Sequence, residues 1–273
     1  YTAAFRYVDP DTDHWGKART ALDRALSLDP DHPRAHASMG FVLHRQAEEP
    51  DRAEAHFVRA LSLDSDVYWH CGYVFFLLWR SRYEEAMEVA RRAEAQYPFY
   101  HPLPGLSATS ARCAGRLDEA VRLARGVVAD RPRNAASVRD LALSLSRLGR
   151  TDEALAAVPK GTRAAPYFSL VEALVLARAG QRQRAMEVLE SVDLSEAVAL
   201  ADGITSGWVR AQPLAAATLV ALGERDAAIE LLERAQTEDP WVLIYDRCYP
   251  ELYSLESDHR YRRLLGNTGV AAD

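Results

Sequence analysis

Residues 115–132 read GRLDEAVRLARGVVADRP and show the pattern on which most of the chain is built. Ala120, Ala124 and Val127 stand at i, i+4 and i+7, so they lie on one face of a helix. Small side chains on that face let a neighbouring helix approach closely. Pro132, five residues beyond, ends the helix because proline lacks an N–H group and restricts the residue before it. The stretch therefore predicts a packed helix that ends at a proline.

The pattern recurs along the chain at a nearly constant interval. Its lead alanines are Ala18, Ala53, Ala86, Ala120, Ala154, Ala185 and Ala228, and four of the six intervals between them are 33 to 35 residues. The links ahead of them also recur, as GRLDE at 115–119, GRTDE at 149–153 and GERD at 223–226. The glycine of each link ends one helix, and the acidic residues favour the positive N-terminus of the next. An internal repeat of this length outranks any single motif in predicting a fold.

A second apolar-periodic segment precedes each link. Examples are residues 35–45, 67–79, 138–148 and 170–179. Each repeat is therefore predicted to be a helical hairpin, and the chain to be all-α. Isoleucine occurs only three times, which favours helices over strands.

These hairpins resemble the tetratricopeptide repeat (TPR) family, a 34-residue helix-turn-helix unit. The alanine, bulky and proline positions of the second helices carry the resemblance, together with Tyr83-Glu84-Glu85-Ala86 at a helix start and Met39-Gly40 followed by Leu43 in a first helix. The early tryptophan typical of first helices is missing. The resemblance implies a right-handed superhelical solenoid of about seven hairpins over residues 1–240. The expected units are approximately 1–30, 31–65, 66–98, 99–132, 133–166, 167–205 and 206–240.

Three departures from the repeat carry predictions. Pro159 falls inside a second helix, which should be short or kinked. The longest interval contains an insertion at about 193–205, with an extra turn or short helix. The first helix of the first unit looks truncated at Tyr1, so we expect sequence upstream of it.

Residues 241–273 break the pattern and are predicted to cap the solenoid. Asp258 can begin a last short helix and Gly266 can end it, while Leu255, Tyr261 and Leu264 need an apolar surface to cover. The exposed face of a terminal hairpin supplies such a surface. This ending also resembles TPR regions that follow a signalling module in bacterial proteins, which implies a regulatory role.

Composition excludes several classes of protein. Of the residues, 48% are hydrophobic and 26% are charged, as in ordinary soluble domains. The longest apolar stretch, 71–79, is about half of a bilayer span. The net charge of -6 is opposite in sign to that of a typical nucleic-acid binder. Cys71, Cys113 and Cys248 are expected to be free thiols in a reducing cytoplasm, with no structural zinc.

The TPR resemblance places the first helices on a concave groove. Its frame predicts that the groove is aromatic at one end and rich in arginine along its length, with no acidic residue at the lining positions. The predicted partner-binding residues are Arg34, Phe41, His44, Arg45, Tyr68, Phe75, Trp79, Arg112, Arg139, Arg147 and Arg178. Cys71, Leu78, Thr109, Leu143, Tyr167, Leu174 and Arg210 complete the predicted lining. Such a groove suits a partner with acidic residues and an apolar or aromatic anchor.

Each feature also has a simpler explanation. Arginines at the ends of first helices are stabilised by the helix dipole whatever they bind. Tyr68, Phe75 and Trp79 would pack inside the solenoid. His32 and His36 have the i, i+4 spacing of metal ligands but lack a third ligand nearby, so they favour surface or capping roles. Cys71 beside His70, and Cys113, favour buried packing over nucleophilic catalysis.

The sequence thus predicts a non-enzymatic protein-interaction scaffold with no catalytic residue, metal or cofactor, and neither a membrane nor a nucleic-acid partner. Two alternatives remain open. The chain could assemble with itself through its truncated first hairpin, or it could sense an anionic small molecule with its arginines and Trp79.

Overall fold

The computed structural model describes residues 14–46, 49–100, 102–160, 165–194, 211–238, 242–243 and 248–266. The chain divides into two compact units, residues 1–103 and 104–273, which are described separately. Within the described residues the regular elements are helices, without a strand, so the prediction of an all-α solenoid of helical hairpins is confirmed.

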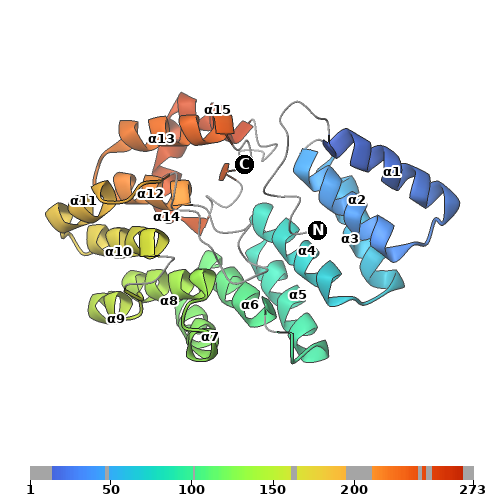
Figure 1. Cartoon of the computed structure of the whole chain (residues 1–273), viewed down its shortest axis with the longest axis horizontal. Coiled ribbons are helices and arrows are strands. Elements are labelled where there is room, and N and C mark those ends of the chain that lie inside the picture. Colours follow the sequence, from blue (N-terminus) through green and yellow to red (C-terminus); the bar gives the residue numbers. More distant parts are fainter. Residues whose placement is uncertain are drawn as a thin grey trace. The chain divides into compact units, whose positions relative to one another are not determined.

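The described residues of unit 1 form five complete helices. They are α1 (His14–Leu28), α2 (Pro33–Gln46), α3 (Pro50–Leu63), α4 (Val67–Trp79) and α5 (Tyr83–Gln96). Consecutive helices α2 and α3, and α4 and α5, pack as antiparallel hairpins, and the first helices α2 and α4 also contact one another (Figure 1). Residues 1–13, on which the truncated first helix was predicted, lie outside the described residues.

Phe57 of α3 is the centre of packing in unit 1. Its ring is 1% exposed and lies between Gly40 of α2 and Gly72 of α4. A Cβ atom at Gly40 would lie 3.0 Å from the Phe57 ring, and one at Gly72 would lie 3.2 Å from it. The two glycines therefore make room for a large aromatic ring where three helices meet.

Unit 2 continues the repeat and ends in a short helical cap. Its elements are α6 (Pro102–Cys113), whose first turn contains the boundary between the units, α7 (Leu117–Asp130), α8 (Ala135–Arg147), α9 (Thr151–Ala156), α10 (Ala165–Arg178), α11 (Arg182–Glu190), α12 (Ala211–Ala221), α13 (Arg225–Glu238), α14 (Pro250–Tyr253), the 3₁₀ turn η2 (Ser254–Ser257) and α15 (His259–Gly266). The first helices α8, α10 and α12 contact one another in turn.

The predicted glycine links adopt the backbone that they require. Gly149, for example, has φ +76°, a conformation that L side chains rarely adopt, and Arg150 N–H donates to the carbonyl of Leu145 across the link. This turn reverses the chain between α8 and α9.

The second helix that was expected to contain Pro159 is short, as predicted. Helix α9 has 6 residues and ends at Ala156, because a proline cannot continue the hydrogen-bonded ladder. The insertion predicted at about 193–205 falls almost entirely on residues outside the described ones.

The C-terminal segment packs on the last hairpin. Helix α14 contacts α12, and α15 contacts α13. Leu252, Leu255 and Leu264 are buried, and Gln236 of α13 donates a hydrogen bond to the carbonyl of Leu264. This segment therefore covers apolar surface that the last hairpin would otherwise expose to water.

Candidate partner-binding surface

We call the surface formed by α2 and α4 the first-helix face of unit 1. Tyr68 is 57% exposed there and makes an edge-to-face contact with Tyr100, with ring centroids 5.7 Å apart. Phe41 is partly exposed beside Trp15, and Phe75 is also partly exposed. Arg34 is exposed at the start of α2. These predicted residues are accessible to a partner.

Trp79 and His44 do not lie at the surface, and the prediction that they bind a partner is wrong. Trp79 is 1% exposed and His44 is 3% exposed, and their rings meet edge to face at 4.2 Å. The last turn of α4 is buried because α2 and α5 both pack against that helix. Leu78, predicted to line the groove, is buried for the same reason. The side chain of Arg45 lies outside the described residues.

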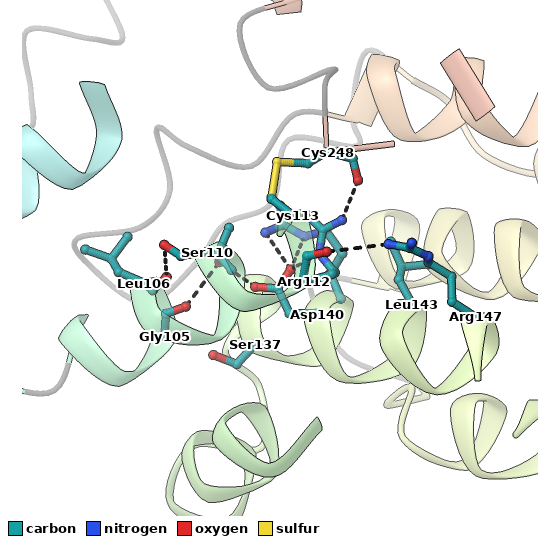
Figure 2. A network of polar contacts seen from close by, with 12 residues as sticks. Gly105, Leu106, Ser110, Arg112, Cys113, Ser137, Asp140, Leu143, Arg147 and Cys248 are labelled. Atoms are coloured by element: carbon teal, nitrogen blue, oxygen red, sulfur yellow. Dashed lines mark hydrogen bonds and ion pairs between the residues drawn. A yellow bond between two sulfur atoms is a disulfide. The ribbon is translucent and has the colours of Figure 1, made fainter. Parts of the chain in front are cut away.

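The first-helix face of unit 2, formed by α6, α8 and α10, contains a buried cluster of charges. Arg112 lies beside Asp140 (Figure 2), with its Nε 2.7 Å from Asp140 Oδ1. Arg139 Nη2 lies 2.9 Å from the same oxygen. Thr109 donates its hydroxyl to the other carboxylate oxygen of Asp140. Asp140 is fully buried, Arg112 is 3% exposed and Arg139 is 7% exposed. One carboxylate therefore serves two arginines inside the fold.

This cluster stabilises its own charges. Burial by itself would raise the pKa of Asp140, but the charges of Arg139 and Arg112 and the hydrogen bond from Thr109 outweigh burial and hold that pKa below its usual value. Burial likewise opposes the charge of Arg139, and the neighbouring Asp140 carboxylate reverses that effect and raises the pKa of Arg139. Arg112 and Arg139 are thus paired inside the fold, and the prediction that they lie free in an open groove is wrong. The sequence reasoning missed Asp140 because a single acid within a first helix carries no periodic signal.

Three arginines lie in the last turns of successive first helices. Arg147 ends α8 and Arg178 ends α10 at the same repeat position, whereas Arg112 is the second-last residue of α6 and lies one position earlier in the repeat. Arg147 Nη1 approaches the main-chain carbonyl of Arg112 at 3.5 Å, and Arg178 Nη1 donates to that of Leu143 at 3.2 Å. Each of these two guanidiniums is therefore held against the preceding first helix.

Two of the three arginines also bind the C-terminal segment. Arg112 Nη1 donates to the carbonyl of Cys248 at 2.7 Å, and its guanidinium lies over the Tyr249 ring at 5.5 Å. Arg178 binds Glu251 with two N–H donors, at 2.7 and 3.1 Å. These partners lie 136 and 73 residues away along the chain. The pattern of repeats contains no indication of either pairing.

Arg147 differs from Arg112 and Arg178. It is exposed, and among the described residues no carboxylate lies within ion-pair distance of it. Partial burial of the guanidinium and the charges of Arg178 and Arg112 lower its pKa. Arg147 is therefore a cation beside two other cations, and the charge of Glu251, which does not pair with it, only partly offsets them; its donors are available to an external acid.

Cys113 and Cys248 form a disulfide, so the expectation of free thiols is wrong for this pair. Their Cα atoms are 4.7 Å apart, and the bond joins the end of α6 to the start of the C-terminal segment (Figure 2). Structural disulfides are typical of oxidising compartments, so the expected cytoplasmic location loses the support of free thiols. Cys71 is unpaired, and burial raises the pKa of its thiol to about 12, which leaves it protonated at neutral pH.

The remaining candidates lie in structural places. Tyr167, Leu143 and Leu174, predicted to line the groove, are buried in the core of unit 2, and Arg210 lies outside the described residues. His36 does not face His32 but pairs with His56 of α3, with their Nδ1 atoms 2.9 Å apart. In the described part of the chain, no three His, Cys, Asp or Glu residues gather closely enough to hold a metal ion.

Comparisons with known proteins agree with the repeat pattern. The family model for the tetratricopeptide repeat matches residues 39–101 and 106–167. A tetratricopeptide repeat protein from Parabacteroides merdae is 14% identical with a TM-score of 0.63, and the match covers 93% of this chain and 92% of that one. Yeast Tom70 is 15% identical with a TM-score of 0.60, and the match covers 95% and 55% of the two chains. A comparison with curated protein sequences finds no match.

A chain of the Naa15/Naa10 complex bound to HypK-THB is 18% identical with a TM-score of 0.42; the match covers 96% of this chain but only 38% of that one. At such identities, likeness to solved structures shows the fold alone.

The hairpins, their spacing and the stacked first helices define a helical repeat protein. Residues 39–101 and 106–167 of the chain belong to the tetratricopeptide repeat family. Proteins of this family are generally non-catalytic interaction scaffolds, and the fold of this chain is of that kind. In the described segments, no helix combines the length and apolar character needed to cross a membrane.

Proposed function

We propose that the chain is a non-enzymatic scaffold that binds a partner protein through the first-helix faces of its units. On unit 2, Arg147 binds a carboxylate of the partner. On unit 1, Tyr68, Phe75 and Phe41 contact an apolar or aromatic side chain. Within a longer protein, this region would regulate or localise an attached effector module.

The observation that carries the proposal is the difference between Arg147 and the two arginines in the last turns of the neighbouring first helices, Arg112 and Arg178. Arg112 and Arg178 each bind acceptor groups of the C-terminal segment, a carbonyl in one case and a carboxylate in the other. Arg147 ends α8, the first helix between α6 and α10 in the chain, and no carboxylate among the described residues lies within ion-pair distance of it. A hydrogen bond to a charged group contributes about 1.5–3 kcal/mol, enough to make one arginine decisive for a weak peptide complex.

The apolar part of the proposal rests on exposure. A tyrosine that is 57% exposed beside partly exposed phenylalanines presents apolar area that a partner could remove from water. Aromatic side chains contribute strongly to binding when they become buried at an interface.

Selection from a displayed library of random 12-residue peptides tests the proposal. We expect the selected peptides to be enriched in Asp and Glu and to contain an aromatic or aliphatic residue. Fluorescence anisotropy should then show that Arg147→Glu weakens binding at least 10-fold, in line with the loss of a charge-assisted hydrogen bond and the addition of a repulsive charge.

Arg122→Glu is the matched control, because it makes the same change of charge on the second helix α7, where the Arg122 side chain is 70% exposed. It should leave affinity within about twofold, as expected for a screened surface charge. For the apolar contact, Tyr68→Ala should weaken binding and Val58→Ala, on the second helix α3 and 50% exposed, should not. Selected peptides without acids, or equal affinity of the Arg147→Glu and Arg122→Glu variants, would contradict the proposal.

A further inference from the structure

The start of the C-terminal segment lies against the first helices of unit 2. In only four residues, 248–251, the segment bonds covalently to Cys113, accepts a hydrogen bond from Arg112, places Tyr249 under the same guanidinium and pairs Glu251 with Arg178. Cys248 is 7% exposed and Tyr249 is 3% exposed. The segment therefore binds the arginines in the last turns of α6 and α10, the first helices before and after the one that Arg147 ends.

We infer that residues 248–251 are a tethered ligand of the first-helix face of unit 2, and that the Cys113–Cys248 disulfide is a redox latch that holds this ligand in place. The inference rests on the proposed function, because it assigns a means of regulation to the face that binds the partner. In the oxidised chain, residues 248–251 cover Arg112, so a partner's acid can bind only at Arg147. Reduction of the disulfide uncovers the position at Arg112.

The surroundings of the disulfide determine how it is reduced. Cys113 is partly exposed, whereas Cys248 is buried. A dithiol reductant therefore attacks the sulfur of Cys113 with one thiolate, and the bond to Cys248 breaks. The leaving thiolate belongs to Cys248, whose main-chain carbonyl binds the Arg112 guanidinium, and a positive charge near the sulfur favours the thiolate form.

The exchange balances within the reductant and the protein. The second thiol of the reductant displaces Cys113 from the mixed disulfide, and the reductant becomes a cyclic disulfide. Two electrons and two protons pass from the reductant to the protein, leaving thiols at Cys113 and Cys248. No other oxidant or reductant is needed.

Contacts other than the disulfide also hold the C-terminal segment, and they differ in how strongly they oppose its release. Tyr249 and the Cys248 carbonyl cover the buried Arg112–Asp140 pair. When they move away, these two charges regain water, and this hydration favours release of residues 248–249. In contrast, Leu252, Leu255 and Leu264 are 0 to 5% exposed, and these apolar contacts oppose release. Loss of the disulfide therefore frees residues 248–251 while α15 stays on α13.

Hydrogen–deuterium exchange of the whole chain, with and without dithiothreitol, tests the latch. We expect exchange at the amides of residues 248–249 and 251–253 to speed up at least 10-fold on reduction, with no change in α15. Cys248→Ser should reproduce the fast exchange without reductant. Cys71→Ser is the control, because Cys71 lies outside the disulfide and should leave the response to reductant unchanged.

Unchanged exchange at 248–253 would overturn the inference, and so would equal acceleration of α15, since that result would describe a general staple of the fold. The acidic peptides selected above provide a second readout: their affinity should rise at least threefold on reduction. Peptides that bind equally well in both redox states would overturn the latch and leave the proposed function standing. Peptides that require Arg147 in neither state would contradict the proposed function, whatever the exchange rates show.

Discussion

Asp140 is the residue on which the interior of unit 2 depends most. Its carboxylate is fully buried and accepts hydrogen bonds from Arg112, Arg139 and Thr109. Buried ion pairs contribute little compared with apolar residues of the same shape, but the removal of one partner leaves an uncompensated charge. The packing of α6 on α8 is therefore sensitive to the replacement of a single carboxylate oxygen of Asp140.

Replacement of Asp140 by Asn should lower the free energy of unfolding by about 3–5 kcal/mol at pH 7, because two buried guanidiniums lose their counter-charge. Urea unfolding followed by circular dichroism measures this change. Asp226→Asn is the control: its carboxylate is exposed and pairs with Arg260 at the surface, so the change should cost less than about 1 kcal/mol.

The same pair of variants has a signature in pH. The pKa of Asp140 is lower in the folded chain than its usual value, so its contribution is complete above about pH 4 and is lost as pH falls through the folded pKa. The difference in stability between wild type and Asp140→Asn should therefore shrink toward pH 2. A difference that stays constant between pH 7 and pH 2 would show that Asp140 acts through its shape and not its charge.

Single residues were also the scale at which the sequence was least informative. The TPR frame places a residue on a helix face, but it does not reveal what lies opposite. Arg112 and Arg178 were correctly placed on first helices, yet their partners Cys248 and Glu251 lie far away along the chain. Trp79 was expected to line the groove because the TPR frame places it on that face, whereas packing by α2 and α5 buries it.

Among the elements, the three-helix junction around Phe57 explains two glycines that the TPR pattern only partly anticipates. Met39-Gly40 fits a first-helix signature, and the structure supplies the reason for the glycine. A Cβ atom at Gly40 would meet both the Phe57 ring and the carbonyl of Ala53 at 3.0 Å. The backbone carbonyl cannot move without disturbing α3.

Gly40→Ala should therefore destabilise the chain by about 1–3 kcal/mol through overpacking. Gly126→Ala is the matched control, because Gly126 also lies within a helix, α7, but has open space around it. There the added methyl should stabilise by about 0.5–1 kcal/mol, since alanine loses less backbone entropy in a helix. Thermal unfolding shows whether each variant is less or more stable than the wild type. A stabilising Gly40→Ala would show that the junction is looser than its distances indicate.

The elements themselves were well predicted by physical spacing. Alanines at i, i+4 and i+7, glycine links and terminal prolines correspond to second helices such as α7 and α13, and Pro159 corresponds to the short α9. These signals are local: each depends on residues within one or two helical turns. The disulfide was missed because nothing local relates Cys113 to Cys248, which lie 135 residues apart.

At the scale of the whole molecule, a period of about 34 residues was sufficient to identify the repeat family, but it did not indicate that the chain forms two compact units. Nor did it show that the cap reaches back to α6 through residues 248–251. Long-range contacts of this kind depend on the tertiary fold of unit 2. Because these contacts occupy Arg112 and Arg178, Arg147 is the arginine of these three that is available to a partner on the first-helix face of unit 2.

The most direct test of that statement is a titration of the ¹H–¹⁵N signals of the arginine Nε–H groups by nuclear magnetic resonance. The probe is N-acetyl-glutamate N-methylamide, and the neutral N-acetyl-glutamine N-methylamide is its control. We predict a saturable shift of the Arg147 signal with the glutamate probe only, and no shift of Arg178, which already binds Glu251. In Glu251→Gln, Arg178 should respond as well. An Arg147 signal that does not move, or that moves equally with both probes, would contradict the proposal that this arginine binds a partner's acid.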